Sequence, residues 1–89
     1  MEIDKNDPGK PIGKVVYLFE DGKGVKIELS DKVKIGDTIY ISIDDEPVEC
    51  KLTDIKIEGI SVQKGFGGDT IELNVGKHVQ VGSMVYKLS

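Results

Sequence analysis

The sequence lacks several residue types, and each absence narrows the range of possible proteins. It contains no arginine, no tryptophan and no alanine, and Cys50 is its single cysteine. One cysteine cannot form an internal disulfide or a cysteine-based zinc site, so we expect a reduced, cytoplasmic setting. No apolar run is long enough to cross a membrane, and residues 1–10 are too polar for a signal peptide or an anchor.

Positive charge is also scarce. Twelve lysines stand against sixteen acidic residues in 89, which gives a net charge of −4. Nonspecific nucleic-acid binding depends on neutralising phosphates, so this balance excludes a basic nucleic-acid clamp, and we expect no DNA ligand. A local lysine patch stays compatible with the count, because net charge does not describe how charge is distributed.

The residues that are abundant favour β-structure. Isoleucine, valine and threonine supply 24 residues, whereas leucine and methionine supply seven. β-Branched side chains fit a pleated sheet, and eleven glycines provide turn formers. The composition therefore predicts an all-β fold, and the length predicts one domain with a single core.

Alternating apolar and polar residues predict seven short strands separated by turn residues. We expect the strands over residues 12–19, 25–29, 39–43, 48–57, 60–64, 71–75 and 79–88. The predicted architecture is a small, closed or nearly closed antiparallel β-barrel of six or seven strands over residues 12–89, preceded by a flexible tail over residues 1–11.

Within these strands the alternation also predicts the core. The inward positions include Ile39, Ile41, Ile71 and Leu73, with Cys50 as a small core residue. In the segment 48–57 the apolar positions change from even to odd numbers. A β-bulge near Thr53–Asp54 would reconcile the two phases.

One motif occurs twice. The segment VKIGDTIYI at 33–41 resembles VQVGSMVYK at 79–87, with Gly36 and Gly82 at matching positions. Glycine permits a positive φ, so each copy is expected to be a turn that leads into a strand. Two copies do not make a solenoid, which needs three or more repeats.

Four short motifs follow one another in a family-like order: Gly13-Lys14-Val15, the segment VKIGDTI at 33–39, GDTI at 68–71 and VGSMV at 81–85. Over about residues 12–88 the chain resembles the β-barrel that forms the second domain of translation elongation factors. It is also similar to the small C-terminal barrel of the collagenase-like peptidases.

The resemblance implies a non-catalytic binding module that contacts an RNA end or a translation-related protein. The alternative is an accessory barrel that docks on a peptidase-like or RNA-modifying enzyme. The chain has no phosphate loop of the form G-x-x-x-x-G-K-[ST], so GTP binding is not implied. We expect no enzyme activity, no catalytic residue, no cofactor and no metal site.

Two groups of polar residues were considered as metal or catalytic sites. His78 has no neighbouring cysteine or second histidine, so it is read as a loop histidine. Asp44, Asp45, Glu46 and Glu49 lack the alternating ligand spacing of a calcium loop, which favours a solvated acidic turn.

Phe66 is the first candidate binding residue. It lies among glycines in the segment 65–69, which predicts a flexible hairpin loop with an aromatic side chain beside Lys64. An exposed aromatic ring next to a cation suits a nucleobase and its phosphate, or an apolar pocket of a partner. The alternative is that Phe66 plugs the mouth of the barrel.

Lysines supply the other candidates. Lys14, Lys26 and Lys34 would form a basic stripe if they share the outer surface of the barrel. Acidic residues are interleaved with these lysines, so mutual neutralisation is the alternative. The absence of arginine argues against recognition by a planar, bidentate cation.

Overall fold

The computed structural model describes residues 10–20, 24–42, 47–76 and 79–88, and this part of the chain is built from strands and turns without a helix. The predicted tail lies outside the described residues except for Lys10 and Pro11, which begin the first strand. The strands are β1 (Lys10–Leu18), β2 (Gly24–Leu29), β3 (Val33–Lys34), β4 (Thr38–Ile41), β5 (Val48–Lys51), β6 (Ile55–Ile57), β7 (Ile60–Val62), β8 (Lys64–Gly65), β9 (Thr70–Asn74) and β10 (Met84–Leu88).

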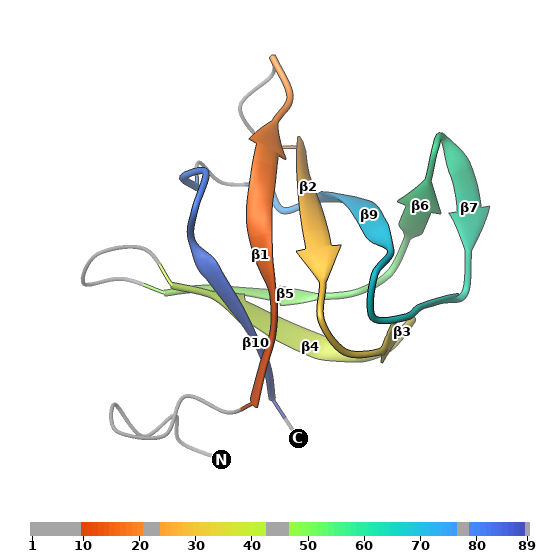
Figure 1. Cartoon of the computed structure of the whole chain (residues 1–89), viewed down its shortest axis with the longest axis horizontal. Helices are drawn as coiled ribbons and strands as arrows, with labels where there is room; N and C mark the ends of the chain where they lie inside the picture. Colours follow the sequence, from red (N-terminus) through yellow and green to blue (C-terminus); the bar gives the residue numbers. More distant parts are fainter. Residues whose placement is uncertain (1–9, 21–23, 43–46, 77–78, 89) are drawn as a thin grey trace.

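Eight of these strands form one curled antiparallel sheet (Figure 1). Its order is β5-β4-β10-β1-β2-β9-β6-β7, and β3 pairs with β8 in a separate two-stranded ribbon. The sheet is open, because its edge strands β5 and β7 do not pair with each other. The all-β prediction is confirmed, whereas the prediction of a closed or nearly closed barrel of six or seven strands is wrong.

The segment 48–57 explains the open edge. β5 pairs with β4, whereas β6 pairs with β7 and β9, so the segment is two strands in different parts of the sheet. Thr53 and Asp54 separate the two strands, and the residues on either side of them, Leu52 and Ile55, are both buried. The change of phase at Thr53–Asp54 therefore marks the end of one strand and the start of another, and the predicted bulge there is wrong.

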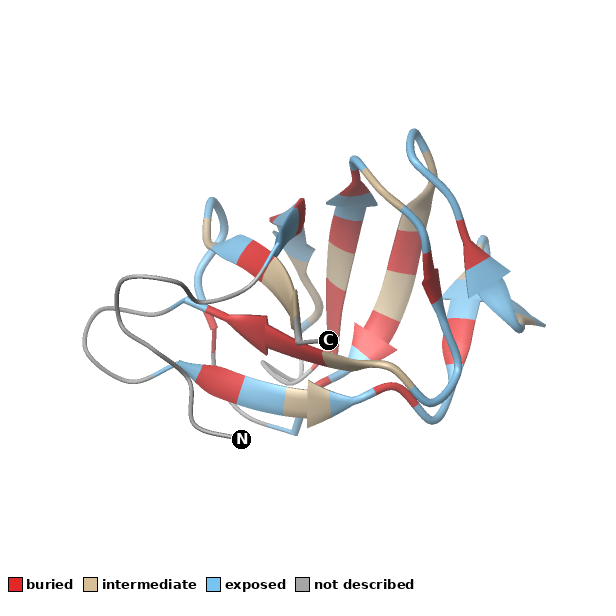
Figure 2. Ribbon diagram, turned by 90° about the horizontal axis from the view of Figure 1, so that it is seen from below, coloured by how far each residue is buried: buried red, intermediate tan, exposed pale blue. Residues whose placement is uncertain are grey.

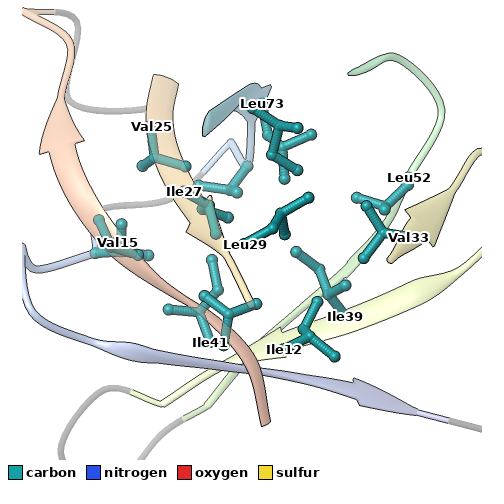
Figure 3. Packing of buried hydrophobic residues seen from close by; sticks show 14 of the residues in the cluster. Ile12, Val15, Val25, Ile27, Leu29, Val33, Ile39, Ile41, Leu52 and Leu73 are labelled. Carbon is teal, nitrogen blue, oxygen red and sulfur yellow. The ribbon is translucent and has the colours of Figure 1, made fainter. Parts of the chain in front are cut away.

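The core fills the inside of the curled sheet (Figure 3). The predicted core residues Ile39, Ile41, Ile71 and Leu73 are all buried, and Cys50 is half-buried against the cluster. Buried and less buried residues alternate along β9 and along β2 from Val25, as the sequence pattern predicts (Figure 2). The alternation is broken in β1, where Ile12 and Gly13 are both buried, and in β4, which is buried from Ile39 to Ile41.

The repeated motif forms two equivalent turns. Gly36 and Gly82 have φ angles of +98° and +94°, the left-handed region that favours glycine. In each turn the glycine N–H donates a hydrogen bond to the carbonyl of one residue in a neighbouring segment. The N–H of that same residue donates to the carbonyl of the residue that follows the glycine. These bonds are Gly36 to Leu52 and Leu52 to Asp37 in the first turn, and Gly82 to Val15 and Val15 to Ser83 in the second, all 2.8 to 2.9 Å long.

The strands that follow the two turns pair with each other. β4 lies antiparallel to β10 with Tyr40 opposite Tyr86, and the two rings pack edge to face 5.6 Å apart. In the repeated motif Ile39 is equivalent to Val85, and Ile41 is equivalent to Lys87. Ile41 pairs with Val85 and Ile39 pairs with Lys87, so exchanging the two strands gives the same register. An approximate two-fold axis therefore passes between Tyr40 and Tyr86.

Candidate functional site

The ribbon of β3 and β8 places two lysines side by side on its outer face. Val33 pairs with Gly65, and Lys34 pairs directly with Lys64. Val33 is buried, and a side chain at Gly65 would approach Leu29 and Ile71 to within 3 Å. Because Gly65 has no side chain, β8 lies directly on the core. The alternation along each strand then turns Lys34 and Lys64 outward together.

A cavity of about 270 Å³ lies on this outer face. Residues two apart in a strand share a face, so Lys32 accompanies Lys34, and Phe66 accompanies Lys64. Lys87 reaches the cavity from β10. The residues that line it are Lys32, Val33, Lys34, Asp37, Lys64, Phe66 and Lys87. We call this cavity the lysine pocket.

Asp37 is the one acidic residue of the lysine pocket, and its carboxylate already has partners. Its Oδ2 accepts a hydrogen bond from the Lys34 backbone N–H at 3.0 Å and lies 3.3 Å from the Lys87 Nζ. Lys87 is thereby held at the rim of the pocket. Four lysines and one aspartate give the lysine pocket a net charge of +3, although the whole chain carries −4.

A second carboxylate, that of Asp31, lies beside the pocket lining and is paired with a lysine of its own. Lys10 forms an ion pair with Asp31 beside the ribbon. The hydrogen bond from the Lys10 ammonium, the Lys32 backbone N–H and the charges of Lys10 and Lys87 hold the pKa of Asp31 below its ordinary value of 3.8. This aspartate therefore stays ionised in mildly acidic solution.

Phe66 lies on the surface with 55% of its area exposed. Its backbone N–H donates to the Asp69 carboxylate and its carbonyl accepts the Asp69 N–H, both at 2.9 Å. Gly68 and Asp69 also bond to Leu29. The segment predicted as a flexible hairpin loop is thus a turn that is hydrogen-bonded to the end of β2. The exposed ring also rules out the alternative that Phe66 plugs the barrel.

The structure does not bring Lys14 and Lys26 to this site. Lys14 lies opposite Glu28 on the next strand. Lys26 lies opposite Glu72, and its Nζ sits 5.5 Å from the centre of the Tyr17 ring. The stripe of Lys14, Lys26 and Lys34 is therefore not a continuous basic surface, because glutamates stand at the cross-strand positions opposite Lys14 and Lys26.

The other polar candidates add no second site. His78 and the acidic residues 44–46 lie outside the described residues, and Glu49 is exposed on β5. Within the described ranges no three histidine, cysteine or acidic side chains are grouped to hold a metal ion. In the same ranges no helix could span a bilayer. Burial raises the pKa of the Cys50 thiol, which disfavours the reactive thiolate.

A second cavity, of about 300 Å³, lies at the open side of the sheet between β5 and β9. Its lining includes two lysines and two carboxylates, which are Lys51, Lys56, Asp54 and Glu72. These charges balance, so the second cavity lacks the strong single-sign field of the lysine pocket.

Of the seven residues that line the lysine pocket, the sequence predicts three as binding residues and does not predict Lys32, Val33, Asp37 and Lys87. Phe66, Lys64 and Lys34 were predicted. Lys32 could have been added, because it precedes Lys34 by two positions in the same alternation. Lys87 and Asp37 could not, since only the pairing of β10 with β4 and the turn at Gly36 bring them to the ribbon.

The second copy of the turn shows that this turn requires neither the Lys34 nor the Asp37 side chain. Gln80 and Ser83 occupy the positions equivalent to Lys34 and Asp37, and the turn keeps the same backbone hydrogen bonds. Like charges directly opposite in a sheet are destabilising. The Lys34–Lys64 pair is therefore unfavourable for the free fold and would be offset by an anion.

No protein-family model and no curated protein matches the chain, but solved structures do. The C-terminal domain of a protein assigned as a U32 peptidase from Geobacillus thermoleovorans superposes with a TM-score of 0.81 at 13% identity, over 90% of this chain and 93% of that chain. Its selenomethionine variant gives 0.79 at 14% identity, over 88% and 99%.

The third structure is a bacterial selenocysteine-specific elongation factor, with a TM-score of 0.67 at 20% identity. The match spans 96% of this chain and 16% of that one, so it concerns one part of a much larger protein. The fold is that of a translation-factor barrel. It is equally the fold of the peptidase C-terminal domain, and the resemblance to both families predicted from the sequence is confirmed.

Proposed function

We propose that this protein is a non-catalytic module that binds single-stranded RNA at the lysine pocket. The observation that carries the proposal is the direct pairing of Lys34 with Lys64 beside an exposed Phe66. Two cations held at one point attract phosphate, and the adjoining ring offers a face on which a base can stack. The structural similarity to part of an elongation factor supports RNA as the ligand.

The charge distribution favours one binding surface. Apart from the lysine pocket the chain is strongly acidic, and Lys14 and Lys26 are matched with Glu28 and Glu72 across the sheet. An RNA strand is therefore attracted to the ribbon and repelled elsewhere. The module works without GTP and without catalysis, and we expect it in the cytoplasm.

Fluorescence anisotropy with a labelled single-stranded RNA of ten nucleotides tests the proposal. Phe66→Ala should weaken binding about fivefold or more, since stacking contributes about 1–3 kcal/mol per base. Lys64→Gln should also weaken binding, because it removes a cation that neutralises phosphate. Their matched controls are Lys14→Gln and Ile60→Ala, which change an exposed lysine and an exposed apolar residue outside the pocket. Phe66→Ala should change the free energy of unfolding by less than about 0.5 kcal/mol.

Salt provides a second measurement. For three phosphates contacted on a single strand, the affinity should fall with a log–log slope of about −2. Removing one pocket lysine should reduce that slope by about 0.7, whereas Lys14→Gln should leave it unchanged. Equal losses in the pocket variants and their controls, or no binding at all, would refute the proposal.

A second candidate function is an accessory barrel that docks on a peptidase-like or RNA-modifying enzyme. The match over 93% of the peptidase C-terminal domain favours it. A pull-down from native lysate, with and without RNase, separates the two functions. Capture of an enzyme that survives RNase treatment and persists in Lys64→Gln supports the accessory role, whereas RNase-sensitive capture supports the RNA module.

A further inference from the structure

The lysine pocket has more positive charge than one backbone phosphate needs. Lys32, Lys34, Lys64 and Lys87 line one cavity from three strand regions, and Asp37 is the one carboxylate among the lining residues. A phosphodiester inside an RNA strand carries about one negative charge. A phosphomonoester at a strand end carries about −1.5 to −2 at pH 7 and offers three free oxygens.

The geometry points the same way. Lys34 and Lys64 face outward from directly paired positions, and Lys87 is held in place by Asp37, so the cations surround a small concave site. A terminal phosphate can enter such a site from one side, whereas an internal phosphate must let the chain enter and leave. Phe66 follows β8 two positions after Lys64, so it lies on the same face, where the terminal base would stack.

We propose that the lysine pocket recognises the terminal phosphomonoester of an RNA strand, with the terminal base on Phe66. This inference rests on the proposed RNA-binding function and specifies its ligand. Lysine, rather than arginine, suits a rounded site in which several point charges surround one phosphate. The base-stacking ring favours a nucleotide over a phosphorylated peptide.

Calorimetric titration with one pentaribonucleotide in three forms tests the inference: 5′-phosphate, 3′-phosphate, and hydroxyl at both ends. One phosphorylated form should bind about tenfold tighter than the hydroxyl form at pH 7.5. That advantage should shrink as the pH falls from 7.5 to 5.5, because the second phosphate pKa is near 6 and the ligand loses charge. The hydroxyl form, titrated over the same range, reports changes in the protein itself.

Variants connect the effect to the pocket. In Lys34→Gln/Lys64→Gln the phosphorylated and hydroxyl forms should bind equally, whereas Lys14→Gln should keep the tenfold difference. Thermal melts check that each variant is folded.

The outcomes separate this inference from the proposed function. Equal binding of all three RNA forms by the unaltered protein overturns the terminal-phosphate inference and leaves RNA binding intact. Absence of binding by any RNA form overturns both. Inorganic phosphate and a phosphoserine peptide of equal charge serve as further probes, and tighter binding of either one than of every RNA form also overturns the inference.

Discussion

At the scale of single residues, Lys64 combines a proposed role in binding with an electrostatic cost to the fold. It lies opposite Lys34, and replacing it by glutamate would turn a like-charge pair into an opposite-charge pair. Cross-strand pairs of this kind differ by about 0.2–1 kcal/mol. We therefore expect Lys64→Glu to raise the free energy of unfolding by that amount while abolishing RNA binding.

Urea unfolding with and without 1 M salt measures this effect. The stabilisation should disappear in high salt, because exposed charges are screened there. Lys14→Glu is the control, since it would create a like-charge pair with Glu28 and should destabilise the fold instead. A Lys64→Glu protein that is less stable than the original would contradict the cost assigned to the lysine pair.

Asp31 makes a prediction about acid stability. Its pKa is lowered in the folded protein, first by the hydrogen bond from Lys10, so the unfolded chain takes up the proton first. The stability from Asp31 is therefore present above its ordinary pKa of 3.8 and is lost as the pH falls through the folded value. Urea midpoints between pH 5 and pH 2 should fall less in Asp31→Asn and in Lys10→Gln than in the original protein. Parallel pH profiles would show that the ion pair does not persist in solution.

Ile41 tests the core. It is fully buried, and truncation to alanine should cost roughly 2–5 kcal/mol, a large part of what a small domain possesses. Ile60→Ala changes the same residue type at a position that is 67% exposed and should cost less than about 0.5 kcal/mol. Equal melting temperatures for the two variants would contradict the assignment of inside and outside.

At the scale of elements, the hairpin of β6 and β7 contains the one non-glycine residue with positive φ in the described part of the chain. Glu58 has a φ of +52° and Gly59 of +79°, and the two residues alone connect Ile57 to its partner Ile60. Such two-residue turns favour asparagine followed by glycine, and glutamate in this conformation is strained.

Glu58→Asn should therefore stabilise the hairpin, which stands at the edge of the sheet in Figure 1. Hydrogen exchange of the β6 and β7 amides should slow about threefold to fivefold, which corresponds to roughly 0.6–1 kcal/mol. Glu58→Gln removes the same charge without the turn preference and should leave exchange unchanged. Faster or unaltered exchange in Glu58→Asn would contradict the strain.

The accuracy of the predicted strand bounds depended on clear alternation, and β10 begins at Met84, five residues after the predicted start. Alternation over five or more residues placed β2 and β9 within one position of their observed bounds. β3 and β8 are only two residues long, which is too short for an alternating pattern to be recognised. The pattern therefore predicts one strand over 60–64, whereas this segment contains β7 and the start of β8.

The candidate site was predictable to the same extent. Lys64 and Phe66 were found because one segment contains both, and Lys34 because of its place on a strand face. The roles of Asp37 and Lys87 depend on contacts between segments 50 residues apart in sequence, which no local pattern encodes. Opposite charges on neighbouring strands likewise removed Lys14 and Lys26 from the site.

At the scale of the whole molecule, the two-fold relation between the turns has a consequence for chain connectivity. β4 continues into β5 through residues 42–47, and β10 pairs with β1 so that Lys87 lies opposite Lys10. The junction between β10 and β1 is thus the counterpart of the β4–β5 loop, but without a peptide connection. We therefore expect the fold to form when the end of β10 is linked covalently to the start of β1 and the chain is cut between β4 and β5.

A circular permutant would test this. It would begin at residue 45, run to Leu88, continue through a linker of about six residues to Lys10 and end at residue 44. We expect circular dichroism and a melting temperature within a few degrees of the original, because every strand keeps its neighbours. A permutant opened between Ile27 and Glu28, within β2, should not fold. Folding of the permutant would show that the fold depends on which strands are neighbours in the sheet. It would not depend on the strand with which the chain begins.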